Sequence, residues 1–203
     1  MPSRPGDHRS DRPSAWIERF APLIPEGGTV LDLACGWGRH TRYLAHRGWR
    51  VLAVDRDAEA IASLAGVSNV NAQVADLEQG PWPYPGARFD AVVVTNYLWR
   101  PLLPKLFDAL HGAGVLLYET FAAGNEHFGR PSNPDFLLRP GELLDAVHGR
   151  LAVIAFEDLC VDAPKRAMVQ RICAVGAAHE LAARANPGAL LGFSALGRPQ
   201  RFR

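Results

Sequence analysis

The sequence has few of the residues that build disulfide-stapled or metal-bound folds. Its 203 residues include three cysteines, Cys35, Cys160 and Cys173. An odd number of widely spaced cysteines does not make a disulfide framework, and the spacing is not that of a zinc site. We therefore expect a fold that depends on a packed core, no metal, and a reducing compartment such as the cytoplasm.

Long apolar runs and an excess of one charge are also missing. No apolar run approaches the roughly 20 residues of a membrane-spanning helix. Lys and Arg number 22 against 21 Asp and Glu, which gives a net charge of +1. Because this balance creates no overall field toward phosphate backbones or acidic lipids, we expect neither nucleic acid nor a membrane as partner.

Composition divides the chain into three regions. Residues 1–14 are rich in Pro, Ser, Arg and Asp and contain no apolar segment, which predicts a disordered lead-in and not a secretory signal. Residues 15–176 alternate between strand and helix patterns and are predicted to form a single domain. Residues 177–203 end in a basic stretch, Arg198 to Arg203, and are expected to be a loosely attached tail.

The most informative stretch is TVLDLACGWGR, from Thr29 to Arg39. Its short apolar run, interrupted by Asp32, predicts a buried parallel strand, and a helix is expected from Arg39. Gly36 and Gly38 allow a tight turn and a close approach of the backbone to a ligand. A carboxylate inside such a strand costs several kcal/mol unless it is paired. The stretch therefore predicts a ligand-binding loop, with a glycine-rich turn and a capping aspartate as the simpler alternative.

The alternation of strands and helices predicts an α/β fold with a mostly parallel sheet covered on both faces. A loop is expected from Gln79 to Arg88, and a longer loop, either functional or disordered, from Phe121 to Pro140. The expected strands are Val30–Ala34, Arg50–Val54, Val70–Val74, Phe89–Thr95, Val115–Tyr118, Leu151–Leu159 and Met168–Val175, and the expected helices are Ala15–Phe20, Arg39–Arg47, one capped by Asp57, Leu102–Leu110 and Gly141–Val147.

Polar residues fall at or just beyond the ends of the first four predicted strands. They are Asp32, Asp55, Asp76 and Asn96, each about one strand and one helix after the one before. Open parallel sheets bind ligands at the carboxyl ends of their strands. The agreement between pattern and polar placement predicts one binding site formed by these four positions.

The loop fits S-adenosylmethionine better than other nucleotide-like ligands. A dinucleotide fingerprint would need a third glycine where Thr41 stands, and no Gly-Lys-Ser/Thr phosphate loop occurs. S-adenosylmethionine has a cationic methionyl end, a ribose diol and an adenine. Asp32 can orient the methionyl end through the loop and water, and Asp55 can accept hydrogen bonds from both ribose hydroxyls. Asp76 and Leu77 can bracket the adenine, although Asp76 can equally be a loop residue.

The stretch VLDLACGWGRHTRYLAHRGWRVLAVDRD resembles the first two motifs of the class I S-adenosylmethionine-dependent methyltransferases. Its D-x-x-C-G-x-G form is most similar to the small-molecule enzymes around the tellurite-resistance protein and thiopurine methyltransferase. The resemblance covers residues 29–175 and implies a seven-stranded Rossmann-like sheet whose last strand, Met168–Val175, is antiparallel to the rest. It implies S-adenosyl-L-methionine as cofactor, bound by Asp32, Ala34, Gly36, Gly38, Arg39, Asp55, Arg56, Asp76, Leu77, Asn96 and Tyr97.

The methyl acceptor is less clearly indicated. The segment Thr95 to Arg100 lacks the Asn/Asp-Pro-Pro-aromatic signature of DNA amino-group methyltransferases, which argues against base methylation. A soft nucleophile such as a thiolate or reduced metalloid needs no general base, whereas an amine or hydroxyl does. No catalytic residue is assigned, and the substrate candidates are Trp99, Arg100, Glu119, His127 and Arg130.

Each of these candidates also has a structural alternative. Glu119 can be a base or a partner of Arg130, and Arg100 and Arg130 can attract an anion or be solvated or salt-bridged surface arginines. The main hypothesis is a methyltransferase for a small soft or anionic acceptor, acting as a monomer or homodimer. The alternatives are a protein or ribosome-associated methyltransferase docked through Arg198 to Arg203, and a non-catalytic cofactor-binding protein.

Overall fold

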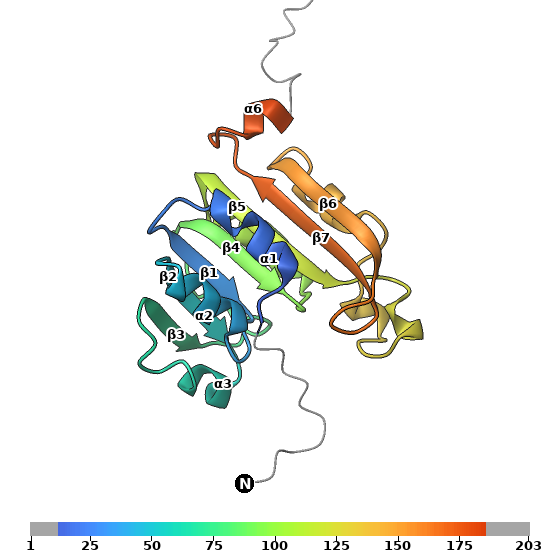
Figure 1. Ribbon diagram of the computed structural model, residues 1–203, viewed down its shortest axis with the longest axis horizontal. Helices are drawn as coiled ribbons and strands as arrows, with labels where there is room; N and C mark the ends of the chain where they lie inside the picture. Colours follow the sequence, from blue (N-terminus) through green and yellow to red (C-terminus); the bar gives the residue numbers. More distant parts are fainter. Residues whose placement is uncertain (1–11, 186–203) are drawn as a thin grey trace, which may run out of the picture.

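The computed structural model describes residues 12–185, which form one seven-stranded sheet in the order β3-β2-β1-β4-β5-β7-β6 (Figure 1). Strands β1 to β5 are parallel, and β7 is antiparallel to both of its neighbours. The α/β class and the reversed last strand implied by the resemblance are confirmed. The strands are β1 Thr29–Leu33, β2 Arg50–Asp55, β3 Val70–Val74, β4 Phe89–Thr95, β5 Leu110–Phe121, β6 Ala152–Val161 and β7 Ala167–Val175.

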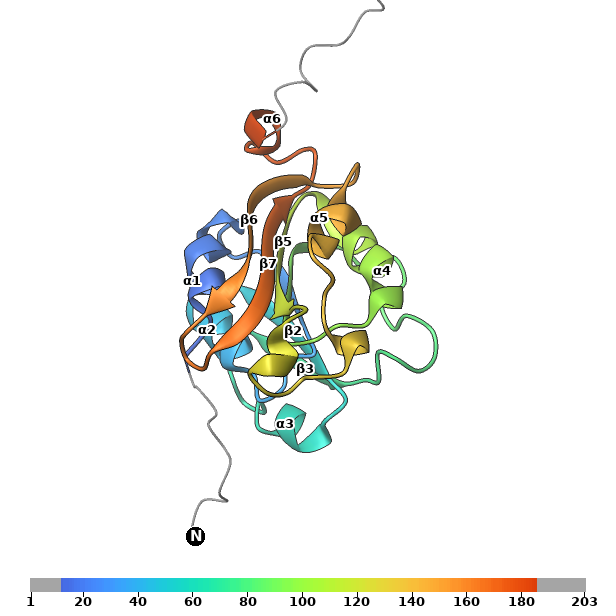
Figure 2. The ribbon, with the colours of Figure 1, turned by 90° about the vertical axis from the view of Figure 1, so that its right-hand side faces the viewer.

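Helices cover both faces of this sheet. Figure 2 shows α1 and α2 on one side and α4 and α5 on the other. The α-helices are α1 Ala15–Phe20, α2 Arg39–His46, α3 Ala58–Ala62, α4 Leu103–Asp108, α5 Glu142–Val147 and α6 Ala182–Ala185, and the 3₁₀ turns are Ala21–Leu23, Arg100–Leu102, Asn125–His127 and Pro134–Phe136.

The alternation of side chains along β1 divides the core into two layers. Leu31 and Leu33 pack in the cluster that contains α4 and α5, whereas Val30 packs with α1 and α2. Because both faces are covered, the strand is apolar at nearly every position. Asp32 shares the face of Val30, so its carboxylate points toward α2.

The fifth strand is longer than its apolar run predicts. The expected strand covered Val115–Tyr118, but β5 extends from Leu110 to Phe121. Its first residue pairs with Phe89 of β4, and its last pairs with Val169 of β7. The expected helix end at Leu110 was therefore wrong, because backbone pairing to two neighbouring strands extends the strand beyond the hydrophobic pattern.

The ends of the described chain are held more firmly than expected. The Ser14 hydroxyl accepts from the amide of Trp16 at 3.1 Å and caps α1. The amide of Ala178 donates to the Gly112 carbonyl at 2.9 Å, and Ala182 is buried. The part of the tail from 177 to 185 is therefore attached to the sheet. Residues 1–11 of the expected lead-in and the basic stretch Arg198 to Arg203 lie outside the described residues.

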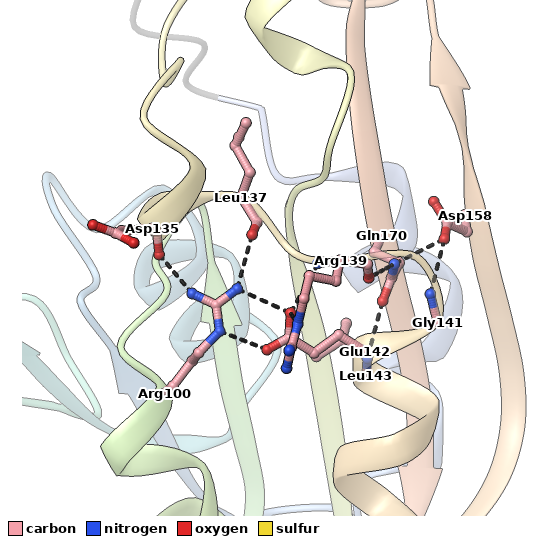
Figure 3. A network of polar contacts seen from close by, with 9 residues as sticks. All are labelled: Arg100, Asp135, Leu137, Arg139, Gly141, Glu142, Leu143, Asp158 and Gln170. Carbon is pink, nitrogen blue, oxygen red and sulfur yellow. Dashed lines mark hydrogen bonds and ion pairs between the residues drawn. The ribbon is translucent and has the colours of Figure 1, made fainter.

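The long segment from Phe121 to Pro140 is held by a network centred on Glu142 and Arg100 (Figure 3). The Arg100 guanidinium donates to both Glu142 carboxylate oxygens at 2.6 and 2.9 Å. It also donates to the carbonyls of Asp135 and Leu137, at 2.7 and 2.9 Å. Nearly all polar atoms of Arg100 are thus used to hold this segment.

Replacing Glu142 with alanine is expected to lower the free energy of unfolding by about 2 to 3 kcal/mol, because the mutation leaves Arg100 without its carboxylate. Burial alone would raise the pKa of Glu142, but the Arg100 hydrogen bonds dominate and lower it to about 2. This contribution is present above the pKa of the unfolded state and is lost as the pH falls toward 2. Urea unfolding at several pH values tests both expectations. Asp145→Ala, an exposed carboxylate on the same helix, is the control and should have little effect.

Candidate functional site

The loop after β1 uses left-handed backbone conformations at Ala34, Gly36 and Gly38, with φ values of 53°, 53° and 74°. Gly38 precedes the first turn of α2 and lies against Leu64. A Cβ added there would stand 2.5 Å from the Leu64 Cδ2 atom, whereas one added at Gly36 would meet nothing within 4 Å. The second glycine is therefore required by both conformation and packing, and the first by conformation alone.

The two glycines should respond differently to alanine. Gly38→Ala is expected to lower the free energy of unfolding by about 2 to 3 kcal/mol, and Gly36→Ala by about 1 kcal/mol. The difference comes from the buried Leu64 side chain, which must move to admit the new methyl group. Thermal unfolding of the two variants side by side checks the difference, and equal losses would contradict the packing argument.

Asp55 connects the end of β2 to the glycine loop. Its Oδ2 atom accepts from the Gly36 amide at 2.8 Å, and its Oδ1 atom accepts from the Asp57 amide at 2.9 Å. Asp57 in turn caps α3 by accepting from the amides of Glu59 and Ala60, as predicted. Asp55 is thus free of the capping role and lies against a cavity.

A cavity of about 400 Å³, the first cavity, lies at the carboxyl ends of the parallel strands. Of the eleven residues predicted to bind the cofactor, those that line it are Ala34, Asp55, Arg56, Asp76, Leu77, Asn96 and Tyr97. The connection from 121 to 140 contributes Phe121, Pro131 and Phe136 to its wall. Asp76 also accepts from the amides of Glu78 and Gln79, so it shapes its own turn as well.

Asp32 does not line this cavity. It is 1% exposed, and its Oδ2 atom accepts from the Thr41 hydroxyl at 2.5 Å. Its Oδ1 atom has no hydrogen-bond partner within residues 12–185. Burial raises the pKa of Asp32 to about 7, partly offset by the Thr41 hydrogen bond. The residue thus lies in the core and contacts α2 through Thr41.

A second cavity, of about 510 Å³, adjoins the first and shares Asn96 and Phe121 with it. Arg39, predicted to bind the cofactor, lines this second cavity, as do the substrate candidates Glu119 and Arg130. Glu119 accepts from Arg171 at 3.1 Å, so its partner is not Arg130. Two of the five substrate candidates therefore face a cavity next to the first.

The other substrate candidates lie elsewhere. Arg100 is bound to Glu142 and to two carbonyls, which supports its structural alternative. Trp99 is partly buried against the core on the α4 side. His127 is exposed, and its ring lies 3.8 Å from Glu126. None of these three lines either cavity.

His40 is a residue that the sequence reasoning missed. It is 2% exposed, its Nε2 atom accepts from the Ser14 amide at 3.0 Å, and its Nδ1 atom lies 3.2 Å from the Thr95 hydroxyl. Because Nε2 accepts, Nδ1 carries the proton and donates to Thr95. Burial lowers the pKa of His40 to about 3, so the ring stays neutral. It ties the start of α1 to the end of β4, next to Asn96, and no local pattern indicates this.

Within residues 12–185 no three His, Cys, Asp or Glu side chains are grouped so that they could hold a metal ion. In the same range, no helix has the length and apolar character needed to cross a membrane.

Comparisons with known proteins agree with this fold. Residues 30–113 match the family described as "Methyltransferase domain". The protein YqeM of Bacillus subtilis (strain 168) is 29% identical over 124 residues, which are 56% of this chain and 49% of YqeM. The chain thus spans about half the length of this curated relative.

Solved structures are similar over most of the chain. TehB from Haemophilus influenzae superposes with a TM-score of 0.67 at 18% identity, covering 79% of this chain and 61% of TehB. An S-adenosylmethionine-dependent methyltransferase from Mesorhizobium loti has a TM-score of 0.61 at 18% identity, covering 80% of this chain and 98% of that one. The solved structures and the sheet topology together show that the chain has a fold similar to that of TehB, and residues 30–113 within it match a methyltransferase domain.

Proposed function

We propose that the protein transfers a methyl group from S-adenosylmethionine to a small acceptor. The observation that carries the proposal is the grouping of Asp55, Asp76 and Asn96, from three successive strand ends, around one cavity beside the glycine loop. This arrangement suits a ligand with a ribose diol, an aromatic base and a charged tail. The matched methyltransferase domain and the similarity of the fold to solved S-adenosylmethionine-dependent methyltransferases support the same cofactor.

The residues present fit this cofactor. Each Asp55 carboxylate oxygen accepts one backbone N–H and keeps lone pairs for ribose hydroxyls. The buried Asp32 Oδ1 atom, unpartnered within residues 12–185, suits a nearby cationic group. Asp76 and Leu77 would hold the adenine, and Asn96 and Tyr97 would hold the sulfonium side. Of the remaining predicted residues, Ala34, Gly36, Gly38 and Arg56 would surround the nucleoside, and Arg39 would pair with the methionyl carboxylate.

S-adenosylmethionine supplies a methyl group on a sulfonium that is already an activated leaving group. The contribution of the chain is then to position the acceptor in line with the methyl group and to exclude water. Phe121, Pro131 and Phe136 cover the first cavity and serve this exclusion. A new bond forms from the acceptor's lone pair, and the electrons of the broken bond remain on sulfur.

The environment of Glu119 favours an acceptor that enters deprotonated. Glu119, the candidate base, is already engaged in an ion pair with Arg171 at 3.1 Å. A thiolate or a reduced metalloid requires no base and fits this environment. We therefore propose a soft or anionic acceptor, bound in the second cavity. A single domain over residues 15–176 and a monomer or homodimer remain predictions.

Calorimetric titration with S-adenosylhomocysteine tests the cofactor, with NADH as the control ligand. We expect S-adenosylhomocysteine to bind at least about 100-fold more tightly than NADH. Binding of NADH in its place would overturn the proposal. Product analysis with a panel of thiols and metalloids then tests transfer, and binding without any transfer would identify a non-catalytic cofactor-binding protein.

A further inference from the structure

The second cavity differs from the rest of the molecule in its charge. The chain carries a net charge of +1, yet the cavity is lined by six Arg or Lys residues and by only two carboxylates, Glu18 and Glu119. Glu119 is already neutralised by Arg171, which also lies 2.8 Å from Glu157. The lining of the cavity is therefore locally cationic.

Arg39 is assigned above to the methionyl carboxylate, and two of the other cations have no counter-ion within residues 12–185. Arg166 lies 3.6 Å from Asp162, but within residues 12–185 neither Arg130 nor Lys165 takes part in a hydrogen bond or ion pair. Arg130 and Lys165 line the same cavity, and the Lys165 Nζ atom lies close to the backbone of Gly129, the residue before Arg130, since a Cβ added at Gly129 would stand 3.1 Å from it. One cation comes from the connection after β5 and the other from the turn between β6 and β7. Two uncompensated like charges at the edge of one cavity favour an anion.

Apart from Ser14, Asn96 and Asn125, the remaining wall of this cavity is apolar. Phe121, Phe128 and Val169 line it together with small and aliphatic side chains. A volume of about 510 Å³ lies in the usual range for sites that hold organic ligands of moderate size. An inorganic oxyanion would leave most of this wall without contacts, whereas a molecule with an apolar body and an anionic end would cover it.

We propose that the methyl acceptor is an amphipathic organic anion, whose carboxylate or phosphate binds Arg130 and Lys165. Its apolar body lies along Phe121 and Phe128, and its nucleophilic end reaches Asn96, one of the two residues shared by both cavities. This inference rests on the proposed function, because it takes the first cavity to hold the methyl donor. It goes further by naming the acceptor class and the residues that select it.

The test measures ligand binding to protein saturated with S-adenosylhomocysteine. The probes are octanoate, octyl phosphate, octylamine and inorganic phosphate, titrated by calorimetry. We expect the better of the two anionic amphiphiles to bind at least about 10-fold more tightly than octylamine or inorganic phosphate. Comparing octanoate with octyl phosphate identifies the anionic group. If octylamine binds equally well, the proposal that the cavity selects an anion is wrong. If inorganic phosphate binds equally well, the proposal that the apolar wall binds the body of the ligand is wrong.

A charge-removing variant makes the assignment specific. The double variant Arg130→Gln with Lys165→Gln is expected to lower the affinity for the preferred anionic amphiphile about 10- to 100-fold and to leave the affinity for S-adenosylhomocysteine unchanged. The control, Arg88→Gln with Lys105→Gln, removes the same charge from exposed positions that line neither cavity and should change neither affinity. An unchanged affinity of the Arg130→Gln, Lys165→Gln variant for the anionic amphiphile would overturn the inference. A loss of its affinity for S-adenosylhomocysteine would overturn it as well. Failure of the unmodified protein to bind S-adenosylhomocysteine would instead count against the proposed function.

Discussion

Replacing Asp55 with alanine is expected to weaken S-adenosylhomocysteine binding by about 100-fold or more, on the order of 2.7 kcal/mol. The carboxylate has two functions that the mutation removes together. It holds the Gly36 amide at 2.8 Å, which sets the shape of the glycine loop, and it faces the first cavity. Hydrogen bonds from ribose hydroxyls to a charged acceptor contribute about 1.5 to 3 kcal/mol each. Calorimetric titration of the variant measures the loss directly.

Asp57→Ala is the matched control for this experiment. It removes a carboxylate two residues away that caps α3 and does not line the first cavity. We expect it to lower the free energy of unfolding by about 1 kcal/mol and to leave the affinity for S-adenosylhomocysteine nearly unchanged. Equal losses of affinity in the two variants would show that the binding depends on the general integrity of this loop and not on the Asp55 carboxylate.

The protein without cofactor is expected to become less stable as the pH rises from about 4 to about 7, because of Asp32. Burial raises the pKa of this carboxyl from 3.8 to about 7, so the folded state retains a proton that the unfolded state releases. The favourable contribution is fully present below the unfolded pKa and is lost as the pH rises through the folded pKa. A shift of this size corresponds to a difference on the order of 4 kcal/mol in the free energy of unfolding.

Two variants isolate the effect of Asp32. Asp32→Asn removes the titrating group, so the loss of stability between pH 4 and pH 7 should largely disappear. Thr41→Val removes the hydroxyl that stabilises the ionised carboxylate, so the loss should increase. Urea unfolding curves at half-unit pH intervals measure the change of the free energy of unfolding with pH for each variant. If the free energy of unfolding of Asp32→Asn falls with pH as steeply as that of the unmodified protein, the effect belongs to another group.

Much of the fold followed from local patterns. The apolar run around Leu31, the glycines at 36 and 38 and the acid at the end of β2 depend on residues close in sequence, so their structure is visible in periodicity and spacing. The reversed direction of β7 came from the resemblance alone. The cofactor residues remain predictions, but seven of the eleven do line one cavity.

Contacts between residues that are distant in the sequence could not be predicted in the same way. Arg100 faces Glu142, 42 residues later in the chain, and His40 meets Ser14 and Thr95, 26 and 55 residues away. Arg130 and Lys165 come from separate connections, and nothing local to either indicates that they share a cavity.

The sequence by itself determined the alternating α/β pattern, the glycine loop and the polar strand ends, because each depends on neighbours within one strand or one turn. The tertiary structure decided which charged side chains are neutralised and which face an open cavity. The physical reason is that the electrostatic environment of a side chain depends on segments that folding brings together. No periodic pattern in the sequence indicates which of these segments will meet.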